Sequence, residues 1–527
     1  MVRTYLDEVE QGTPELVEAE ERKSKKERKL LPPGASSKTL YKDIIRIAWP
    51  SLIELTLTSL VSMVDMMMVG SIAGTGTAAV AAVSLATQPR FLFLMLIMAL
   101  NTGLTAVIAR ARGAGKHDEV NDILRQGVLL TFVIAIPLTI GGILAARPLI
   151  EFMAAGGIQE STIADSTVYL QIQMAGFITM AIPSTITAAL RGTGNSRIPM
   201  VYNIVANLVN VFLNWVLIYG NFGAPAMGVA GASLATVLGQ AVSCVMALYA
   251  VTNRKAYMHL TFKKFKMNLQ ILGQIAKVGG PALVEQVIMR IGMIVFTRIV
   301  TGLGEVNLTT HQVCMNIQSL SFMSGQAFAV SSTTLVGQSL GKIRPDMAEH
   351  YSRRCRRLGL YVAIFLMVVF AVFGGQVVKL YNGNLYIDGV VDMAKAQVVV
   401  LGSFIMLFVA FLQPIQSSQF ILAGGLRGAG DTRSTAMITL ITMLIVRPII
   451  GFALVQWIGW GDINFALPEW ASKVASFLAG IDREVVGSVE VNMGLIGAWI
   501  AVAADQCLRS LLVMFRYNSG KWKKIKI

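Results

Sequence analysis

Residues 190–197 read Leu-Arg-Gly-Thr-Gly-Asn-Ser-Arg, and the pattern returns at residues 426–433 as Leu-Arg-Gly-Ala-Gly-Asp-Thr-Arg. Outward from this pair, Pro50-Ser-Leu-Ile-Glu54 returns as Pro281-Ala-Leu-Val-Glu285. Residues 228–232 return as residues 494–498 in the same way. Three repeats in the same order indicate that the chain holds two copies of one structural unit.

The chain is too apolar for a soluble protein of its length. Of its 527 residues, 54% are hydrophobic and only 14% are charged, whereas soluble domains carry about 25% charged residues. The apolar residues gather in twelve stretches, many of which reach the ~20 residues that a helix needs to cross a bilayer. These stretches span residues 43–70, 78–110, 122–147, 164–190, 198–220, 228–252, 272–301, 307–340, 352–379, 394–424, 433–458 and 492–516. We therefore expect an all-α membrane protein with twelve transmembrane helices.

Each copy of the repeat contains six stretches, so both copies enter the membrane in the same direction. We expect two six-helix lobes related by a pseudo-twofold axis along the membrane normal. The predicted parts are a charged, disordered cytosolic tail (1–40), an N-lobe (41–252), a basic cytosolic linker (253–271), a C-lobe (272–516) with an external insertion at about 459–490, and a basic cytosolic tail (517–527).

Lys and Arg cluster after the even-numbered stretches, as at Arg110 and Arg112 or at Lys263 and Lys264. The loops after the odd-numbered stretches hold few basic residues. The positive-inside rule therefore places both termini in the cytoplasm of a multi-pass protein of the cell membrane. Because the net charge of +15 is spread over short loops, we expect no binding of nucleic acid.

One carboxylate stands in an otherwise apolar stretch. Asp65 lies within Val61–Gly70, and an ionisable group inside the bilayer is costly enough to be a functional candidate. It predicts a proton or cation site. The alternative is that Asp65 sits at the outer end of its helix, because Gly70 follows closely.

Four asparagines form a stripe in the fifth stretch. They are Asn203, Asn207, Asn210 and Asn214. Their spacing of four, three and four residues puts them on one helix face. Such a stripe is either a set of ligands or a hydrogen-bonded seam between helices.

Two glutamates occupy symmetric places in the repeat. Glu54 and Glu285 each follow a proline near the start of a stretch, and Glu54 lies about three turns before Asp65 on the same face. They are candidates for a cytoplasmic-side relay or for a cavity lining. The alternative is that they cap broken backbone or pair with a neighbouring arginine.

The other polar groups inside the second copy are expected to be structural. We expect its arginines to pair with Glu285 or with backbone carbonyls, and its lone histidine to pack in the interior. These residues are Arg290, Arg298, Arg447 and His311.

We expect no enzymatic activity and no cofactor. Residues 113–117 look like a phosphate-binding loop, but Arg110 and His117 stand where that loop needs Gly and Ser or Thr. No catalytic triad, zinc motif or paired catalytic carboxylate stands out. Without a nucleotide site, the energy for any transport must come from an ion gradient.

At these motifs the chain resembles the multidrug and toxic compound extrusion (MATE) family, and within it the bacterial NorM-like branch. The likeness covers residues 40 to 516. It rests on the duplicated motif, on residues 64–70 (Val-Asp-Met-Met-Met-Val-Gly), and on residues 105–115 with their echo at residues 333–341. Arg110 stands where the family usually has Gln. The resemblance implies two six-helix lobes, outward export, and coupling to the inward flow of Na⁺ or H⁺.

The resemblance also implies particular site residues. Asn210 and Asn214 match the family's cation-site positions beside Asp65, and Thr236 fits a further ligand. Part of the family has Asp at the position of Asn214. In the second copy, Gln416 and Met289 stand where some members carry acidic groups, so coupling is assigned to the first half and Gln416 is kept only as a candidate for the cavity lining.

The sequence thus predicts a secondary antiporter that exports bulky, cationic organic compounds. The alternative is a flippase for lipid-linked oligosaccharides from the same broad superfamily. The expected partners are small organic molecules and the lipid bilayer, and the expected state is a monomer. Metal binding is not expected, except that Na⁺ is an alternative to H⁺ at Asp65. Because hard cations bind more weakly where fewer charged oxygens surround them, one carboxylate favours H⁺.

Overall fold

A computed structural model gives the structure of the chain. Its fold is built almost entirely from helices. The structure describes residues 36–72, 76–154, 158–253, 257–260, 267–382, 386–387 and 390–525. The first group of helices comprises α3 (Ser37–Gly70), α4 (Gly76–Gly113), α5 (His117–Leu144), α6 (Ala146–Ala154), α7 (Glu160–Ala175), α8 (Phe177–Gly192), α9 (Arg197–Tyr219) and α10 (Gly228–Thr252). The second comprises α11 (Leu269–Thr301), α12 (Glu305–Gly341), α13 (Pro345–Asn382), α14 (Met393–Gly428), α15 (Thr432–Thr439), α16 (Arg447–Phe452), α17 (Glu469–Ala479), α18 (Arg483–Gly487) and α19 (Met493–Asn518).

Nine helical segments of the described chain are long and apolar enough to cross a membrane, and the pair α7–α8, bent by 50°, counts as a tenth if it forms one span. Helices α11 (33 residues) and α12 (37 residues) are as long but are not among these nine. The outer surface carries large apolar side chains such as Leu144, Phe152 and Phe365, which are 77%, 81% and 67% exposed. Apolar exposure on this scale marks a surface that faces lipid rather than water.

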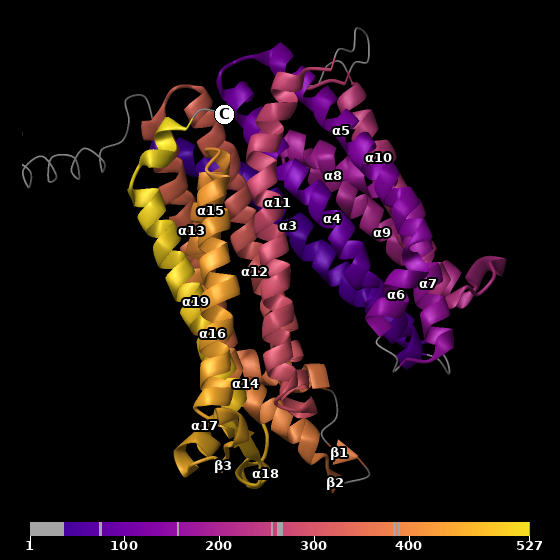
Figure 1. Ribbon diagram of the computed structural model, residues 1–527, viewed down its shortest axis with the longest axis vertical. Helices are drawn as coiled ribbons and strands as arrows, with labels where there is room; N and C mark the ends of the chain where they lie inside the picture. The colour runs from indigo at the N-terminus through magenta and orange to yellow at the C-terminus, as the bar shows by residue number, and fades with distance from the viewer. Residues whose placement is uncertain are drawn as a thin grey trace, which may run out of the picture.

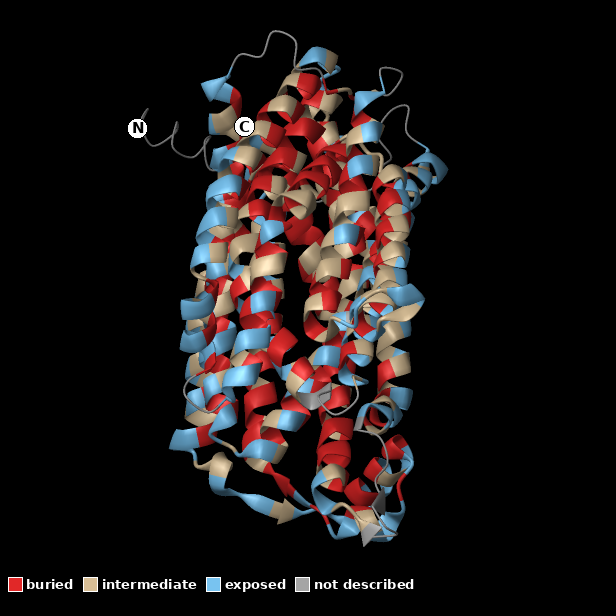
Figure 2. Cartoon of the chain, turned by 90° about the vertical axis from the view of Figure 1, so that its right-hand side faces the viewer, coloured by how far each residue is buried: buried red, intermediate tan, exposed pale blue. Residues whose placement is uncertain are grey.

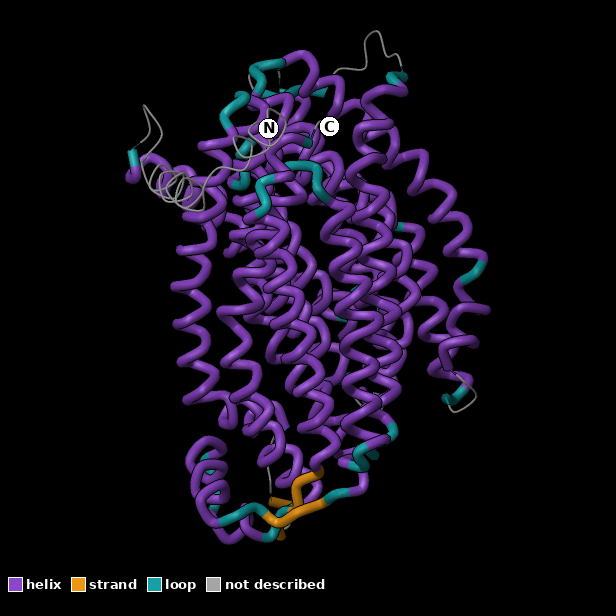
Figure 3. The backbone as a smooth tube through the Cα atoms, turned by 60° about the vertical axis from the view of Figure 1, so that its left-hand side comes forward, coloured by secondary structure: helices purple, strands orange, loops and turns teal. Residues whose placement is uncertain are grey.

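The two groups of helices lie side by side (Figure 1). They come together at the end that holds the C-terminus and diverge towards the other end. That far end carries two small antiparallel sheets, β1 (Tyr386–Ile387) with β2 (Val390–Val391), and β3 (Asn464–Ala466) with β4 (Glu490–Asn492), drawn in orange in Figure 3. The predicted insertion at 459–490 is therefore folded, because β3, α17, α18 and β4 close it into a compact cap.

Helix α3 packs against both groups. Its first turns, with Leu40 and Ile44, share an apolar cluster with Phe328 of α12 and Tyr351 of α13. Its later turns run along α9. Figure 2 shows buried residues dense at the end where the groups meet, with exposed residues on the outer faces. One helix thus ties the two groups together at that end.

Glycines let the two groups approach closely at the same end. A Cβ atom on Gly113 would lie 2.0 Å from the carbonyl oxygen of Gln338, and one on Gly341 would lie 2.1 Å from that of Arg110. Two hydrogen bonds cross the same junction. Thr334 Oγ1 donates to the Arg191 carbonyl at 2.9 Å, and Gln338 Nε2 donates to the Gly192 carbonyl at 3.0 Å.

Several boundaries differ from the sequence-based expectation. Helix α3 begins at Ser37, inside the predicted tail, and residues 1–35 of that tail lie outside the described residues. Helix α11 begins at Leu269, inside the predicted linker. The eleventh stretch is helical but irregular, because π-helical segments at Leu440–Val446 and Ala453–Trp457 flank α16. The C-terminal segment, predicted only as a basic tail, packs against the protein through Trp522, which is fully buried.

Candidate functional site

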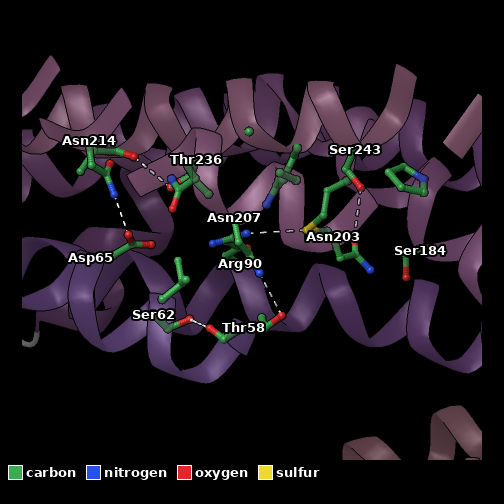
Figure 4. A pocket seen from close by; sticks show the side chains of 18 of the residues that line it. Thr58, Ser62, Asp65, Arg90, Ser184, Asn203, Asn207, Asn214, Thr236 and Ser243 are labelled. Atoms are coloured by element: carbon green, nitrogen blue, oxygen red, sulfur yellow. Dashed lines mark hydrogen bonds between the residues drawn. The ribbon is translucent and has the colours of Figure 1, made fainter. Parts of the chain in front are cut away.

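A cavity of about 580 Å³ lies within the first group of helices, between α3, α4, α7, α8, α9 and α10. Seven of the predicted site residues line it together (Figure 4). They are Glu54, Asp65, Asn203, Asn207, Asn210, Asn214 and Thr236. The structure therefore gathers the carboxylate and the whole asparagine stripe in one place, as the helical periodicity predicts.

The asparagine stripe forms a seam between α3 and α9. Asn203 Nδ2 donates to Glu54 Oε1 at 2.6 Å, and Asn207 Nδ2 donates to Thr58 Oγ1 at 3.3 Å. Asn214 Nδ2 donates to Asp65 Oδ1 at 2.6 Å. In all three pairs the partners are 149 residues apart, which requires the two helices to run parallel in one fixed register.

Asp65 lies at one end of this seam. Besides Asn214, the buried Asn210 amide lies beside it. With that amide turned so that its nitrogen faces α3, Asn210 donates to both carboxylate oxygens of Asp65, at 3.1 and 3.2 Å. The Asn214 Oδ1 atom is buried and has no hydrogen-bond partner among the described residues. The site therefore holds one carboxylate, two amides and an unused amide oxygen.

Helix α10 supplies the back wall of the site. Thr236 Oγ1 accepts a hydrogen bond from Asn210 at 3.3 Å when the amide nitrogen faces α10. Gly239 lies against Asn210, where a Cβ atom would come within 2.9 Å of the Asn210 Cβ. The glycine thus makes room for the amide. Farther along α10, Ser243 donates to Asn203 Oδ1 at 3.1 Å.

Glu54 and Glu285 pair with the arginines of the duplicated motif. Arg191 forms an ion pair with Glu54 at 2.8 Å, and Arg427 forms the matching pair with Glu285. Thr435 Oγ1 also donates to Glu285 at 3.1 Å. Both glutamates are buried. Their contacts match the alternative in which each glutamate pairs with an arginine.

Glu285 is held by Arg427, so it does not pair with Arg290 or Arg447, which was one of the two expected arrangements. Arg290 instead lies over the ring of Phe91, with its guanidinium carbon 4.1 Å from the ring centre. Arg447 pairs with Asp505 at 2.7 Å. His311 is buried beside the rings of Phe296 and Trp499, as the packing interpretation requires.

Gln416 does not belong to this cavity. It is buried in α14 of the second group, where its Oε1 atom has no hydrogen-bond partner among the described residues. Glu285, also in the second group, is likewise absent from the lining. The predicted candidates therefore divide between the two groups of helices, and the cavity belongs to the first.

Arg90 on α4 was missed from the sequence. It lines the cavity, where its guanidinium lies 3.6 Å from the Met180 sulfur. Among the described residues no carboxylate forms an ion pair with it. The signal was available, because an arginine inside the second apolar stretch is as unusual as Asp65 in the first.

Asp505 is the second missed residue. It is fully buried in α19 and is held by Arg447 and by Arg509, which donates at 2.6 and 2.9 Å. Arg509 Nε also donates to Thr442 Oγ1 at 3.0 Å. The second half thus has a carboxylate of its own, although two arginines neutralise it.

The donor set around Asp65 is one carboxylate among neutral amide and hydroxyl groups. Among the described residues no three His, Cys, Asp or Glu side chains come together. Asp65 supplies the single charged oxygen near the amides and Thr236. A hard monovalent cation or a proton suits such a mixture of one carboxylate and neutral oxygens.

Comparison with known proteins agrees with the duplicated architecture. The profile of the MatE family matches residues 50–216 and 281–453. The chain is 27% identical over 493 residues to the "Probable multidrug resistance protein NorM" of Thermotoga maritima, with 92% of this chain and 94% of that protein aligned. It is 27% identical over 424 residues to the "Multidrug resistance protein NorM" of Vibrio vulnificus, with 79% and 88% aligned.

Solved structures share the fold. One is described as the outward-facing conformation of a multidrug resistance MATE family transporter of the MOP superfamily. It superposes with a TM-score of 0.76 at 19% identity, over 92% of this chain and 97% of the other. The family profile covers both halves of the chain, and its two matched segments begin at the repeated Pro50 and Pro281. The chain is thus a multi-pass membrane protein that belongs to the MatE, or multidrug and toxic compound extrusion, family of NorM-like transporters.

Proposed function

We propose that this protein is a secondary antiporter that exports bulky organic compounds in exchange for H⁺ or Na⁺. The observation that carries the proposal is the Asp65 carboxylate, which meets the Asn214 amide at 2.6 Å inside a cavity of about 580 Å³. That volume lies in the range of small-molecule sites, about 300–1,000 Å³. The relatives named as multidrug resistance proteins support the same function.

The Asn214 amide beside Asp65 can take two orientations, which would suit two states of the coupling site. An ionised carboxylate accepts the N–H of Asn214. A protonated carboxyl adds an O–H donor, and a bound Na⁺ takes oxygen ligands; a half-turn of the Asn214 amide would offer an oxygen to either. Proton or cation binding would therefore exchange the contact that Asp65 makes with Asn214 Nδ2 for one with Asn214 Oδ1, the amide oxygen that has no partner among the described residues. We favour H⁺, because only one carboxylate is present.

Transport follows by alternating access between two lobes of six transmembrane helices each, with both termini in the cytoplasm of the cell membrane. In this proposal α11 and α12 also cross the membrane, and α7 and α8 form one bent span. The contacts of Gly113 and Gly341 then close the cytoplasmic end, as in an outward-facing state. A ligand shifts such an equilibrium only by its different affinity for the two states. Inward-moving cation and outward-moving substrate must therefore prefer opposite states.

The cavity charges bear on the substrate. Glu54 is neutralised by Arg191, which leaves Asp65 and Arg90 as opposite charges in one cavity. Asp65 favours a cationic group on the substrate, as we propose, and Arg90 tolerates an anionic group at a second point. A flippase would need a surplus of cations for a pyrophosphate head group. The near balance of charge in this cavity gives the flippase alternative less support.

Transport by everted membrane vesicles tests the proposal. A fluorescent organic cation should accumulate in vesicles that contain the protein when a H⁺ or Na⁺ gradient is imposed. Collapsing the gradient with an ionophore should release it. Accumulation that ignores both gradients would contradict antiport, and uptake driven only by ATP would point to another class of transporter.

A further inference from the structure

A second pocket lies where the two groups of helices meet, away from the Asp65 cavity. Its volume is about 610 Å³. The walls come from the first turns of α3, the end of α4 and the turn between α8 and α9 on one side, and from α12 and α13 on the other. It therefore spans the junction that the Gln338 and Thr334 hydrogen bonds cross.

The pocket is strongly basic. Four cations line it: Arg46, Arg112, Arg197 and Lys342. Its one carboxylate, Asp43, already accepts a hydrogen bond from the Tyr351 hydroxyl at 2.7 Å. Arg112 lies over the ring of Tyr257, 3.4 Å from the ring centre, a contact that holds the guanidinium without neutralising it. Among the described residues none of the four cations forms an ion pair.

The start of α9 opens onto the same pocket. Ser196, Arg197 and Ile198 all line it. Ser196 is the N-cap residue of α9, and its side chain makes no hydrogen bond to the first turn of the helix. Ser196 as a whole is only 1% exposed, and its hydroxyl has no hydrogen-bond partner among the described residues. The helix start adds partial positive charge that favours an anion, while its Ile198 N–H already donates to Asn195 Oδ1 at 3.4 Å and Pro199 has no N–H. The unpartnered hydroxyl adds a donor in a place where a buried polar group otherwise loses free energy.

We propose that this pocket binds a phosphate group of a small ligand or of a phospholipid head, held between the two halves. Arg is well suited to phosphate because its planar fork donates two parallel hydrogen bonds. The volume exceeds what one phosphate needs, so the ligand carries either a second phosphate or a further polar body. A free diphosphate and an anionic lipid head share the phosphate group that these arginines would bind.

Binding would favour the state in which the two halves touch at this end. The pocket walls belong to both halves, so a rocking motion that separates them would take Arg46 and Arg197 away from Lys342. A ligand bound only to the closed arrangement stabilises that arrangement. This consequence rests on the proposed alternating access, whereas the binding site itself does not.

The test measures the melting temperature of the purified full-length protein with two probes. Inorganic pyrophosphate in detergent solution represents a free ligand, and nanodiscs of phosphatidylglycerol, compared with phosphatidylcholine, represent a lipid head. The double variant Arg46→Gln/Arg197→Gln removes two exposed pocket cations. The control Arg344→Gln removes a charge on the same face, where Arg344 pairs with Asp346 outside the pocket.

Wild type and Arg344→Gln should be stabilised by at least one probe, and the double variant should bind it about tenfold or more weakly, since hydrogen bonds to charged groups are the strong ones. A response to pyrophosphate alone identifies a free ligand, and a response to phosphatidylglycerol alone identifies a lipid head. The melting temperature without ligand checks that the double variant is folded. If the double variant does not fold, the single variant Lys342→Gln takes its place and should also weaken binding. No response in wild type, or equal responses in wild type and pocket variants, would overturn the proposal.

Discussion

Asn214 donates a hydrogen bond of 2.6 Å to Asp65 across the junction of α9 and α3, and the two residues stand 149 positions apart in the chain. The same separation recurs at Asn203 with Glu54 and at Asn207 with Thr58. Asp65 is thus the last rung of a regular seam and not an isolated charge. Any change in its protonation or ligation acts directly on the contact between these two helices.

Replacing Asp65 by Asn should abolish gradient-driven export. The substitution keeps the size of the side chain but removes the only carboxylate beside Asn210 and Asn214, so neither H⁺ nor Na⁺ can be exchanged there. Export should fall to the level of vesicles without the protein. The matched control is Gln416→Ala in the second half, which should reduce the rate only mildly. Equal damage from the two substitutions would show that coupling is not confined to the first half.

Much of the helical framework follows from the sequence. Each of the twelve apolar stretches is helical in the structure, because the length of a stretch is set by the bilayer and not by details of packing. The asparagine stripe was equally predictable, since a spacing of four, three and four residues fixes a common face whatever the helix packs against. The division into two lobes of six spans remains part of the proposal.

Partners distant in the chain were harder to predict. Glu285 pairs with Arg427 and not with the arginines on its own or neighbouring spans, because helix packing decides which charges meet. The repeat nevertheless contained the answer, since Glu54 with Arg191 and Glu285 with Arg427 are the same pair in two copies. Asp505 was missed for a different reason: the sequence does not show that Arg447 and Arg509 surround it. Arg90, by contrast, stands inside an apolar stretch and could have been noticed from the sequence alone.

Cysteine labelling should report opposite sides at the two ends of the molecule. A cysteine at Lys342 should react with an impermeant maleimide only from the cytoplasm, and one at Lys473 only from outside. Both lysines are exposed. The four native cysteines are buried or half-buried, so background labelling should be low. The reverse pattern would invert the proposed orientation.

Alanine at Gly113 or Gly341 should separate the two halves at the cytoplasmic end. The new Cβ atoms would meet backbone atoms at 2.0 and 2.1 Å, which side-chain motion cannot relieve. Overpacking costs about 1–3 kcal/mol, or roughly a fivefold to hundredfold shift towards the separated state. The reporter is a cysteine at the fully buried Thr334, which should be labelled faster from the cytoplasm.

The matched control for these substitutions is Gly141→Ala on α5, where nothing lies within 4 Å of the new Cβ atom. It should leave the labelling rate of the Thr334 reporter unchanged. If Gly113→Ala and Gly141→Ala gave the same rate, the close contact would not control closure.

Removing Asp505 should strongly destabilise the second half. Asp505→Ala leaves Arg447 and Arg509 buried with no counter-charge, and breaking a buried pair in this way costs about 3–5 kcal/mol. The free energy of unfolding in detergent, or the melting temperature, measures the loss. Glu469→Ala serves as control, because its ion pairs with Lys473 and Arg483 are exposed and contribute about 0–1 kcal/mol. Similar losses in both variants would show that the buried cluster is not a stabilising unit.

Replacing Asn214 by Asp should shift coupling towards Na⁺. The new carboxylate would stand at hydrogen-bond distance from Asp65, and two like charges so close favour a proton or a cation between them. A second charged oxygen also raises the affinity for a hard cation. The measurement is the initial export rate against external Na⁺ at fixed pH. Wild type should respond mainly to pH, and Asn214→Asp should gain a clear dependence on Na⁺.

The control for this shift is Asn207→Asp, which adds the same charge to the same stripe but faces Thr58. It should leave the Na⁺ dependence close to that of wild type, because no carboxylate stands opposite it to complete a pair of ligands. An equal gain in both variants would mean that charge anywhere in the cavity recruits Na⁺. A wild type that is inactive without Na⁺ and indifferent to pH would refute the preference for H⁺. Asp65 would still be the site, because the remaining ligands around it are neutral oxygens that serve Na⁺ as well.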